Sequence, residues 1–133
     1  MGRFTRERPG LASIALTTDT SILTAVANDY GYDKIFARQV DALCRQGDVV
    51  VGISTSGNSP NVNEALKLAS DREAITVGFT GRDGGAMKDM VEHCLIVPSD
   101  NTARIQEAHI LIGHIICDWV EARSVEARPT DAD

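Results

Sequence analysis

Residues 48–59 read DVVVGISTSGNS, and this stretch decides the fold. Its first half, residues 48–53, is almost entirely aliphatic, which is typical of a parallel strand covered on both faces. Its second half, residues 54–59, is a polar loop with four hydroxyl side chains and one glycine. Pro60 and a stripe of apolar residues follow, which predicts a helix over 61–69. The stretch therefore predicts a strand, a polar loop and a helix, in that order.

The same alternation extends in both directions along the chain. Short aliphatic runs predict three further strands, over residues 11–17, 74–80 and 94–97. Helical spacing of apolar residues predicts helices over residues 19–27, 34–43, 86–91 and 102–123. Strands that alternate with helices through short loops predict an α/β layered fold, with about four mainly parallel strands and right-handed crossovers.

Length and composition limit the classes of protein that this chain can represent. Its 133 residues fit one domain, which we assign to residues 1–124, with a disordered tail over 125–133. A hydrophobic content of 43% is enough for a real core. The net charge of -6 and the lack of a Lys/Arg cluster argue against nucleic-acid binding. No apolar run reaches the ~20 residues of a membrane span and no signal-peptide pattern opens the chain, so we expect a cytoplasmic protein.

The three cysteines predict neither a disulfide framework nor a cysteine-rich metal site. Cys44, Cys94 and Cys117 are odd in number and widely spaced, and none belongs to a CxxC pattern. Each lies in an apolar run, so we expect buried free thiols.

The polar loop is the strongest candidate for a binding site. Ligands of open α/β sheets bind at the carboxyl ends of strands, and a helix N-terminus offers unpaired N–H groups to an anion. The side chains of Ser54, Thr55, Ser56 and Ser59 could therefore form a phosphate cradle without a lysine. Residues of these types also form ordinary loops and caps, and from composition alone the two interpretations are equally good. The loop is not a Walker motif, since no Gly-Lys-Ser/Thr follows.

Other polar residues are weaker candidates when taken by themselves. Asn28 and Asp29 end a predicted helix, where such residues are common. Gln106 and His114 on the last predicted helix are eight residues apart, some 80° past a whole number of turns, so they could flank one pocket. His109 lies on a different face from His114, and a lone histidine on a helix is usually a packed or exposed side chain.

Taken together, these stretches resemble a known family. The segments that carry the resemblance run in order over nearly the whole chain. They are GRF and ERP (residues 2–4 and 7–9), ALT (15–17), LTA and NDYG (23–25 and 28–31), GDV (47–49), STSGNS and PNV (54–59 and 60–62), TG and DGG (80–81 and 83–85), and ARIQE (103–107) with His109 and His114. They resemble the SIS (sugar isomerase) domain, and within it the phosphoheptose isomerases. The STSGNS loop alone marks the domain, and ARIQE with the later histidine marks this subfamily. The implied fold is a three-layer α/β sandwich of flavodoxin-like or Rossmann-like type.

The resemblance implies roles for the candidate residues. Ser54, Thr55, Ser56 and Ser59 match the family's phosphate-contacting loop, and Asn28 and Asp29 match residues that line the sugar site. Gln106 and His114 match two ligands of a zinc site, and His114 also matches a proposed acid/base residue. The implied reaction converts sedoheptulose 7-phosphate to a mannoheptose 7-phosphate through an enediolate, toward lipopolysaccharide or other glycans, in a cytoplasmic homotetramer.

The resemblance also implies that this chain lacks an N-terminal segment. Family members begin with helices, a first strand and a glycine-rich loop leading into a helix that carries a His and a Glu, the other two zinc ligands. We expect their absence to leave a sheet edge or an apolar face exposed, and to weaken catalysis. Two protein ligands would also leave a zinc site below the usual three.

Two other functions compete with the isomerase. A non-catalytic SIS module, such as the relative that associates with the bacterial replication initiator, also contains ARIQE, but it lacks a histidine at the position of His114 and an intact STSGN loop. A sugar-phosphate-sensing regulator would normally bring a DNA-binding domain, and the sequence contains none.

Overall fold

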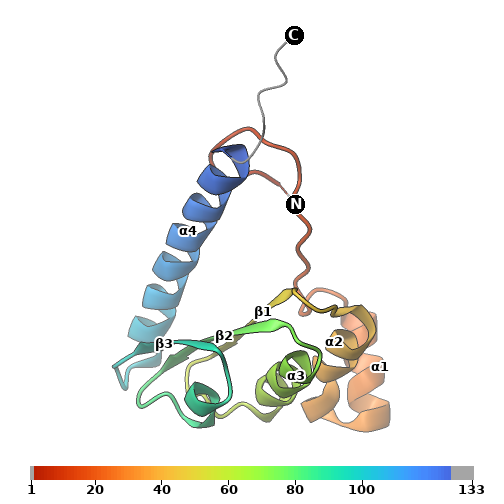
Figure 1. Cartoon of the computed structure of the whole chain (residues 1–133). Coiled ribbons are helices and arrows are strands. Elements are labelled where there is room, and N and C mark those ends of the chain that lie inside the picture. The colour runs from red at the N-terminus through yellow and green to blue at the C-terminus, as the bar shows by residue number, and fades with distance from the viewer. Residues whose placement is uncertain (1, 127–133) are drawn as a thin grey trace.

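The computed structural model describes residues 2–126 and has a small parallel sheet at its centre (Figure 1). The strands β1 (Val49–Ser54), β2 (Ile75–Gly81) and β3 (His93–Val97) lie in this order, and both neighbouring pairs are parallel. The register places Val49 beside Ile75 and Ser54 beside Thr80. The carboxyl ends of β1 and β2 are therefore adjacent, and the polar loop leaves the sheet at that end.

Helices cover the two faces of the sheet unequally. The helical elements are α1 (Thr20–Tyr30), the 3₁₀ turn η1 (Tyr32–Lys34), α2 (Ala37–Leu43), α3 (Pro60–Asp71), the 3₁₀ turn η2 (Ala86–Asp89) and α4 (Thr102–Glu126). The core joins α2 and α3 to one face through Val40, Ala65 and Ala69, with Val50 packed against them. The opposite face receives only α4, which packs on the ends of β2 and β3 and then rises away from the sheet (Figure 1). The predicted three layers are present, but the third is incomplete.

Local signals account for where the helices start. The Asp19 side chain accepts a hydrogen bond from the Ile22 N–H at 3.0 Å, which caps α1. Pro60 occupies the first turn of α3, where a missing N–H costs nothing. The helix predicted over 34–43 is shorter than expected, since its first part forms η1 and α2 begins only at Ala37.

The predicted strand over residues 11–17 is wrong. These residues form no strand in the structure, and only Leu16 in this stretch is even partly buried. An extended segment becomes a strand only when it can pair with a neighbour, and β1 pairs with β2 alone. The sheet therefore has three strands instead of about four.

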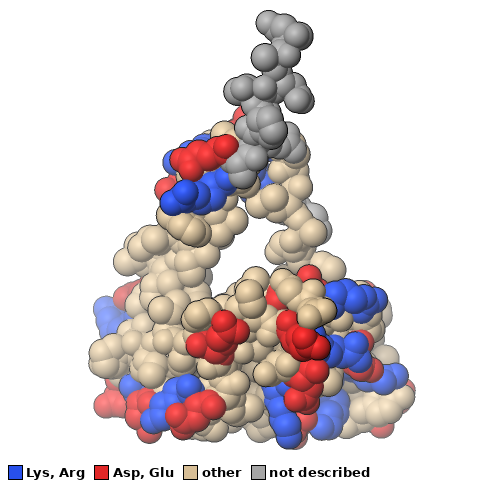
Figure 2. Space-filling view, viewed as in Figure 1, with Lys and Arg blue, Asp and Glu red and all other residues tan. Residues whose placement is uncertain are grey.

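The expected exposure of a sheet edge and of an apolar face is observed. The side chains of Val49, Val51 and Ile53 on β1 are 51–59% exposed, although a strand of this composition is normally covered on both faces. Figure 2 shows an opening flanked by uncharged residues between α4 and the segment that precedes α1. Apolar side chains of α4 are also exposed, namely Ile110, Leu111, Ile115 and Trp119.

Helix α4 extends further than predicted. It continues through Val125 and Glu126, which the sequence analysis assigned to a disordered tail, and residues 127–133 of that tail lie outside the described residues. The prediction for the cysteines holds only for Cys44, because Cys94 is partly buried and Cys117 is exposed. Within residues 2–126, no helix is long and apolar enough to cross a membrane.

A buried carboxylate ties the start of the chain to the end of α4. Glu121 is 1% exposed, and its side chain accepts hydrogen bonds at 2.7 Å from the N–H groups of Phe4, Thr5 and Arg6. The Arg8 guanidinium adds a contact at 3.0 Å. Burial alone would raise the pKa of Glu121, but the N–H groups and the Thr5 hydroxyl together lower this pKa to about 2.

Replacing Glu121 with glutamine is expected to destabilise the protein at neutral pH, because three N–H groups lose a charged acceptor. A carboxyl group whose folded pKa is depressed stabilises the fold above its unfolded pKa, here 4.5, and loses this contribution as the pH falls toward 2. The difference in melting temperature between wild type and Glu121→Gln should therefore be full at pH 7 and shrink between pH 4.5 and 2. Circular dichroism melts across that range measure it. Glu126→Gln, which removes an exposed carboxylate, should show no such difference.

Candidate functional site

The loop after β1 gathers three hydroxyl groups at one point. The Oγ atoms of Ser54 and Ser59 are 2.8 Å apart, and those of Ser54 and Ser56 are 3.5 Å apart. Ser54 is buried, whereas Thr55, Ser56 and Ser59 are partly exposed, so the cluster opens to solvent. The structure therefore brings three of the four predicted cradle residues together, namely Ser54, Ser56 and Ser59.

Unpaired N–H groups surround these hydroxyls. Within the described residues, the backbone N–H groups of Thr55, Ser56 and Ser59 have no hydrogen-bond acceptor. Ser59 is the N-cap of α3, but its hydroxyl makes no capping bond and instead contacts the Ser54 hydroxyl. The N-terminus of α3 and these unpaired donors all lie within residues 55–60, which suits an anion. We refer to residues 54–59 as the cradle.

The segment from Gly84 to Met87 contacts the cradle and supports it, and we call it the supporting loop. The N–H of Met87 donates to the Gly57 carbonyl at 3.0 Å, and the N–H of Ala86 donates to Asn58 Oδ1 at 2.9 Å. Gly57 has a φ of +66°, and a Cβ atom there would lie 2.0 Å from the Gly84 carbonyl oxygen. The cradle is therefore held in place by close backbone contacts that only glycine permits.

The remaining candidate residues lie on α1 and α4, outside the cradle. Gln106 and His114 are both exposed on α4, where eight residues correspond to about 12 Å along the helix axis. The His114 ring lies against Phe4, with ring centroids 5.6 Å apart. Asn28 and Asp29 lie at the end of α1, and within residues 2–126 their side chains hydrogen bond only to each other, at 2.8 Å. Within residues 2–126, no hydrogen bond links any of these four residues to the cradle.

His109 is the site residue that sequence reasoning missed. It is buried, and its ring Nε2 lies 3.0 Å from the Thr80 carbonyl oxygen. Because a carbonyl can only accept, Nε2 carries the proton, and the buried Nδ1 is left without a partner among the described residues. His109 follows Ile105 by one helical turn, and the burial of Ile105 at the Gly81 backbone fixes this face of α4 toward β2. His109 therefore anchors α4 beside the cradle.

The described residues do not by themselves fit a zinc ion. They contain no group of three or more His, Cys, Asp or Glu side chains arranged to hold a metal. Gln106 and His114 supply only two donors, fewer than a zinc site requires.

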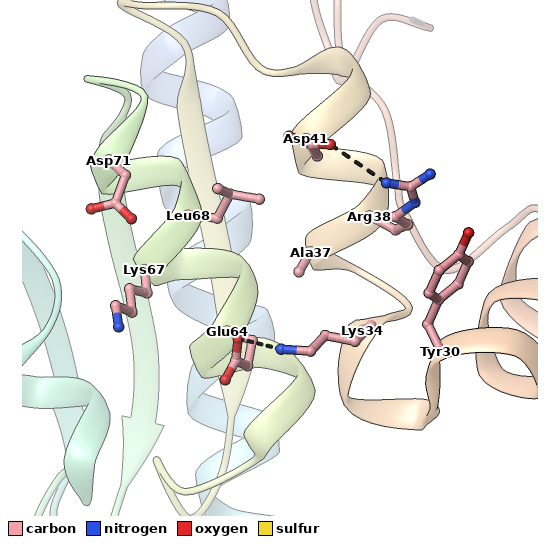
Figure 3. A pocket seen from close by; sticks show the side chains of 9 residues that line it. All are labelled: Tyr30, Lys34, Ala37, Arg38, Asp41, Glu64, Lys67, Leu68 and Asp71. Atoms are coloured by element: carbon pink, nitrogen blue, oxygen red, sulfur yellow. Dashed lines mark hydrogen bonds and ion pairs between the residues drawn. The ribbon is translucent and has the colours of Figure 1, made fainter.

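A separate cavity of about 430 Å³ lies on the outer side of α2 and α3 (Figure 3). Four of its charged groups form ion pairs: Lys34 contacts Glu64 at 2.9 Å, and Arg38 contacts Asp41 at 3.7 Å. No cradle residue lines it. This cavity is a solvated groove between exposed ion pairs, and we assign it no ligand.

Known proteins are similar to this chain in sequence and in fold. The SIS domain family matches residues 1–81. The phosphoheptose isomerase of Geobacter metallireducens is 64% identical over 121 residues, which are 91% of this chain and 64% of the relative. Phosphoheptose isomerase 2 of Campylobacter jejuni is 60% identical, again over 91% of this chain, and 60% of that relative is covered.

Solved structures agree with the sequence matches. A phosphoheptose isomerase from Neisseria gonorrhoeae has a TM-score of 0.82 at 55% identity, covering 84% of this chain and 62% of that one. One from Francisella tularensis has a TM-score of 0.87 at 45% identity, covering 91% and 65%. This chain spans less than two thirds of the length of these relatives. The chain belongs to the SIS domain family, and the relatives that it matches within that family are phosphoheptose isomerases.

Proposed function

We propose that the cradle binds the phosphate group of sedoheptulose 7-phosphate, and that the chain is the phosphate-binding part of a phosphoheptose isomerase. The observation that carries this proposal is the convergence of the Ser54, Ser56 and Ser59 hydroxyls at the N-terminus of α3. A phosphate offers several charged acceptors, and the cradle offers hydroxyl and N–H donors. The identities of 60–64% with phosphoheptose isomerases support this choice of sugar phosphate.

The proposed reaction moves hydrogen between C1 and C2 of the sugar. A base removes a proton from C1 of the ketose, an enediolate forms, and an acid returns a proton to C2, while the hydroxyl proton of O1 passes to O2 to balance the exchange. His114 is our candidate for one of these two groups, because its exposed imidazole can accept or donate a proton. Asn28, Asp29 and Gln106 would contact the sugar.

The proposal also includes a zinc ion and the self-association of the chain. Gln106 and His114 would provide two zinc ligands only if other protein groups completed the site, and a zinc bound in this way would polarise the sugar carbonyl. The exposed apolar residues of α4 favour self-association, so we propose a homotetramer. We place its product in the cytoplasm, as a heptose precursor of lipopolysaccharide or a related glycan.

Binding of sedoheptulose 7-phosphate is expected to raise the melting temperature of the chain. A ligand at 100 times its dissociation constant adds about 2.7 kcal/mol to the free energy of unfolding. Replacing both Ser54 and Ser56 with alanine should weaken binding at least about 100-fold, because each hydroxyl bonds a charged group. Thermal shift and calorimetry measure both effects. Ser70→Ala, at an exposed serine on α3, should bind like wild type, and equal binding by the double variant would refute the cradle.

Replacing His114 with asparagine is expected to leave phosphate binding unchanged and to remove any turnover, because the imidazole lies on α4, away from the cradle. Turnover is measured by the appearance of the aldose product, and binding is measured by thermal shift. If wild type binds the sugar phosphate but converts none, the chain acts as a non-catalytic SIS module. Turnover retained by His114→Asn would exclude this residue as the acid or base.

A further inference from the structure

Three side chains on one face of α4 contact the start of the chain, which loops around the C-terminal end of that helix (Figure 1). His114, Asp118 and Glu121 are separated by four and three residues, a spacing that places them on one helix face. Each of them contacts residues 4–6, which we call the clamp. Glu121 is buried and the other two are exposed, so the clamp is anchored at Glu121 and reaches the other two at the surface.

The Glu121 carboxylate fixes the backbone of the clamp. It accepts hydrogen bonds from three consecutive N–H groups, those of Phe4, Thr5 and Arg6, each at 2.7 Å. Hydrogen bonds to an ionised acceptor are short and strong, so three of them in succession leave the backbone little freedom to rotate. The buried carboxylate therefore sets the directions in which the Phe4 and Arg6 side chains leave the backbone.

The Phe4 ring contacts the His114 imidazole, with ring centroids 5.6 Å apart and an angle of 41° between the ring planes. Of the three histidines, His109 bonds to a carbonyl and His93 lies beside a carboxylate, whereas His114 has no hydrogen bond or ion pair within residues 2–126. An exposed side chain without such bonds normally exchanges between rotamers within nanoseconds. Because aromatic rings favour particular relative geometries, the contact with Phe4 restricts which of these rotamers the imidazole adopts.

Arg6 engages the carboxylate that lies nearest to His114 along the helix. Asp118 follows His114 by four residues, where a carboxylate can pair with an imidazole. Instead, Arg6 Nη1 lies 2.6 Å from Asp118 Oδ1 and also donates to the Asp118 carbonyl at 3.3 Å. An exposed ion pair is usually weak because both side chains must be ordered, but here Glu121 already fixes the Arg6 backbone. The imidazole nitrogens are thus left available to another molecule.

We infer that Phe4 and Arg6 are positioning residues for His114. Phe4 restricts the orientation of the imidazole, and Arg6 prevents Asp118 from pairing with it. The inference rests on the proposed role of His114 as an acid or base, because a proton-transfer group must be both unpaired and correctly oriented toward the substrate. Phosphate binding at the cradle is a separate matter, which the Ser54 and Ser56 variants test.

NMR of the 133-residue chain tests the role of Phe4 without any substrate. The vicinal couplings about χ1 of His114 report how its rotamers are populated. Wild type should have one dominant rotamer, whereas Phe4→Ala should give couplings averaged over the staggered rotamers. Phe4→Tyr keeps the ring and should restore the wild-type couplings. The couplings of His93 on β3 should be the same in all three proteins, and a role of Phe4 in stability alone would leave those of His114 unchanged as well.

A pair of variants tests the role of Arg6. Arg6→Ala releases the Asp118 carboxylate, which should draw the imidazole toward it and change the His114 couplings. Adding Asp118→Ala in the same chain should restore them, because the competing partner is then gone. Arg123→Ala, which removes another exposed arginine that pairs with a carboxylate on α4, should leave the couplings unchanged.

Turnover gives a second readout of the same inference. Phe4→Ala should lower kcat about tenfold with KM unchanged, because orientation of the acid or base is lost while phosphate binding is kept. Two results would overturn the inference: equal His114 couplings in wild type and Phe4→Ala, or couplings in Arg6→Ala that Asp118→Ala does not restore. Both are measured without sugar phosphate, so they are distinguishable from a failure of the proposed function.

Discussion

Gly57→Ala should remove phosphate binding and lower the free energy of unfolding by about 3 kcal/mol. Two costs combine at this residue. Its φ of +66° is unfavourable for any residue with a Cβ atom, and that Cβ would lie 2.0 Å from the Gly84 carbonyl oxygen. Because the obstacle is backbone, it cannot rotate away. The cradle would therefore have to move away from the loop around Gly84 that supports it. The hydroxyls of Ser54 and Ser59 would then no longer lie close together.

Gly47→Ala is the matched control for this prediction. Gly47 has a similar φ of +84°, but an added Cβ would meet nothing within 4 Å. The Gly47→Ala variant should therefore lose only the roughly 1 kcal/mol of unfolding free energy that alanine costs in this backbone conformation. It should bind phosphate like wild type. Thermal denaturation and titration with sedoheptulose 7-phosphate measure both variants. Equal losses in the two variants would show that packing of Gly57 against Gly84 does not shape the cradle.

Sequence patterns predict the parts of the fold that depend on neighbours in the chain. The aliphatic run over 48–53 became β1, Asp19 caps α1, and Pro60 starts α3, because periodicity and capping are local properties. Residues 11–17 have an equally strandlike composition, yet they form no strand. Strand formation requires a paired partner, and composition carries no information about whether that partner is present.

The same distinction between local features and features that depend on distant residues applies to the candidate site. The hydroxyls of the cradle could be predicted because one short loop contains all of them. The supporting loop could not, since the contact between Gly57 and Gly84 joins residues far apart in sequence. His109 was predictable in part: it lies one turn after Ile105, and Ile112 continues the same face. A lone histidine on a helix gives no sign, however, that its Nε2 will meet a strand carbonyl.

His109→Ala is expected to cost about 3 kcal/mol of stability and to weaken phosphate binding as well. The change leaves a cavity beside Phe79, whose ring centroid lies 5.7 Å from that of His109, and it leaves the buried Thr80 carbonyl without its side-chain donor. The Thr80 hydroxyl contacts the Gly84 carbonyl at 3.4 Å, so loosening Thr80 disturbs the loop that supports Gly57. Calorimetric titration and thermal melts measure the two losses.

Two variants distinguish the contribution of the Nε2–H donor of His109 from the contribution of its ring. His109→Gln can place an Nε2–H near Thr80 and should recover phosphate affinity better than stability, because glutamine fills the ring volume poorly. His109→Phe keeps a ring against Phe79 but has no donor, so it should recover stability better than affinity. The opposite ranking would mean that His109 acts through packing alone. The expected ranking would show that one buried hydrogen bond between α4 and β2 positions the cradle, since neither variant touches the cradle residues themselves.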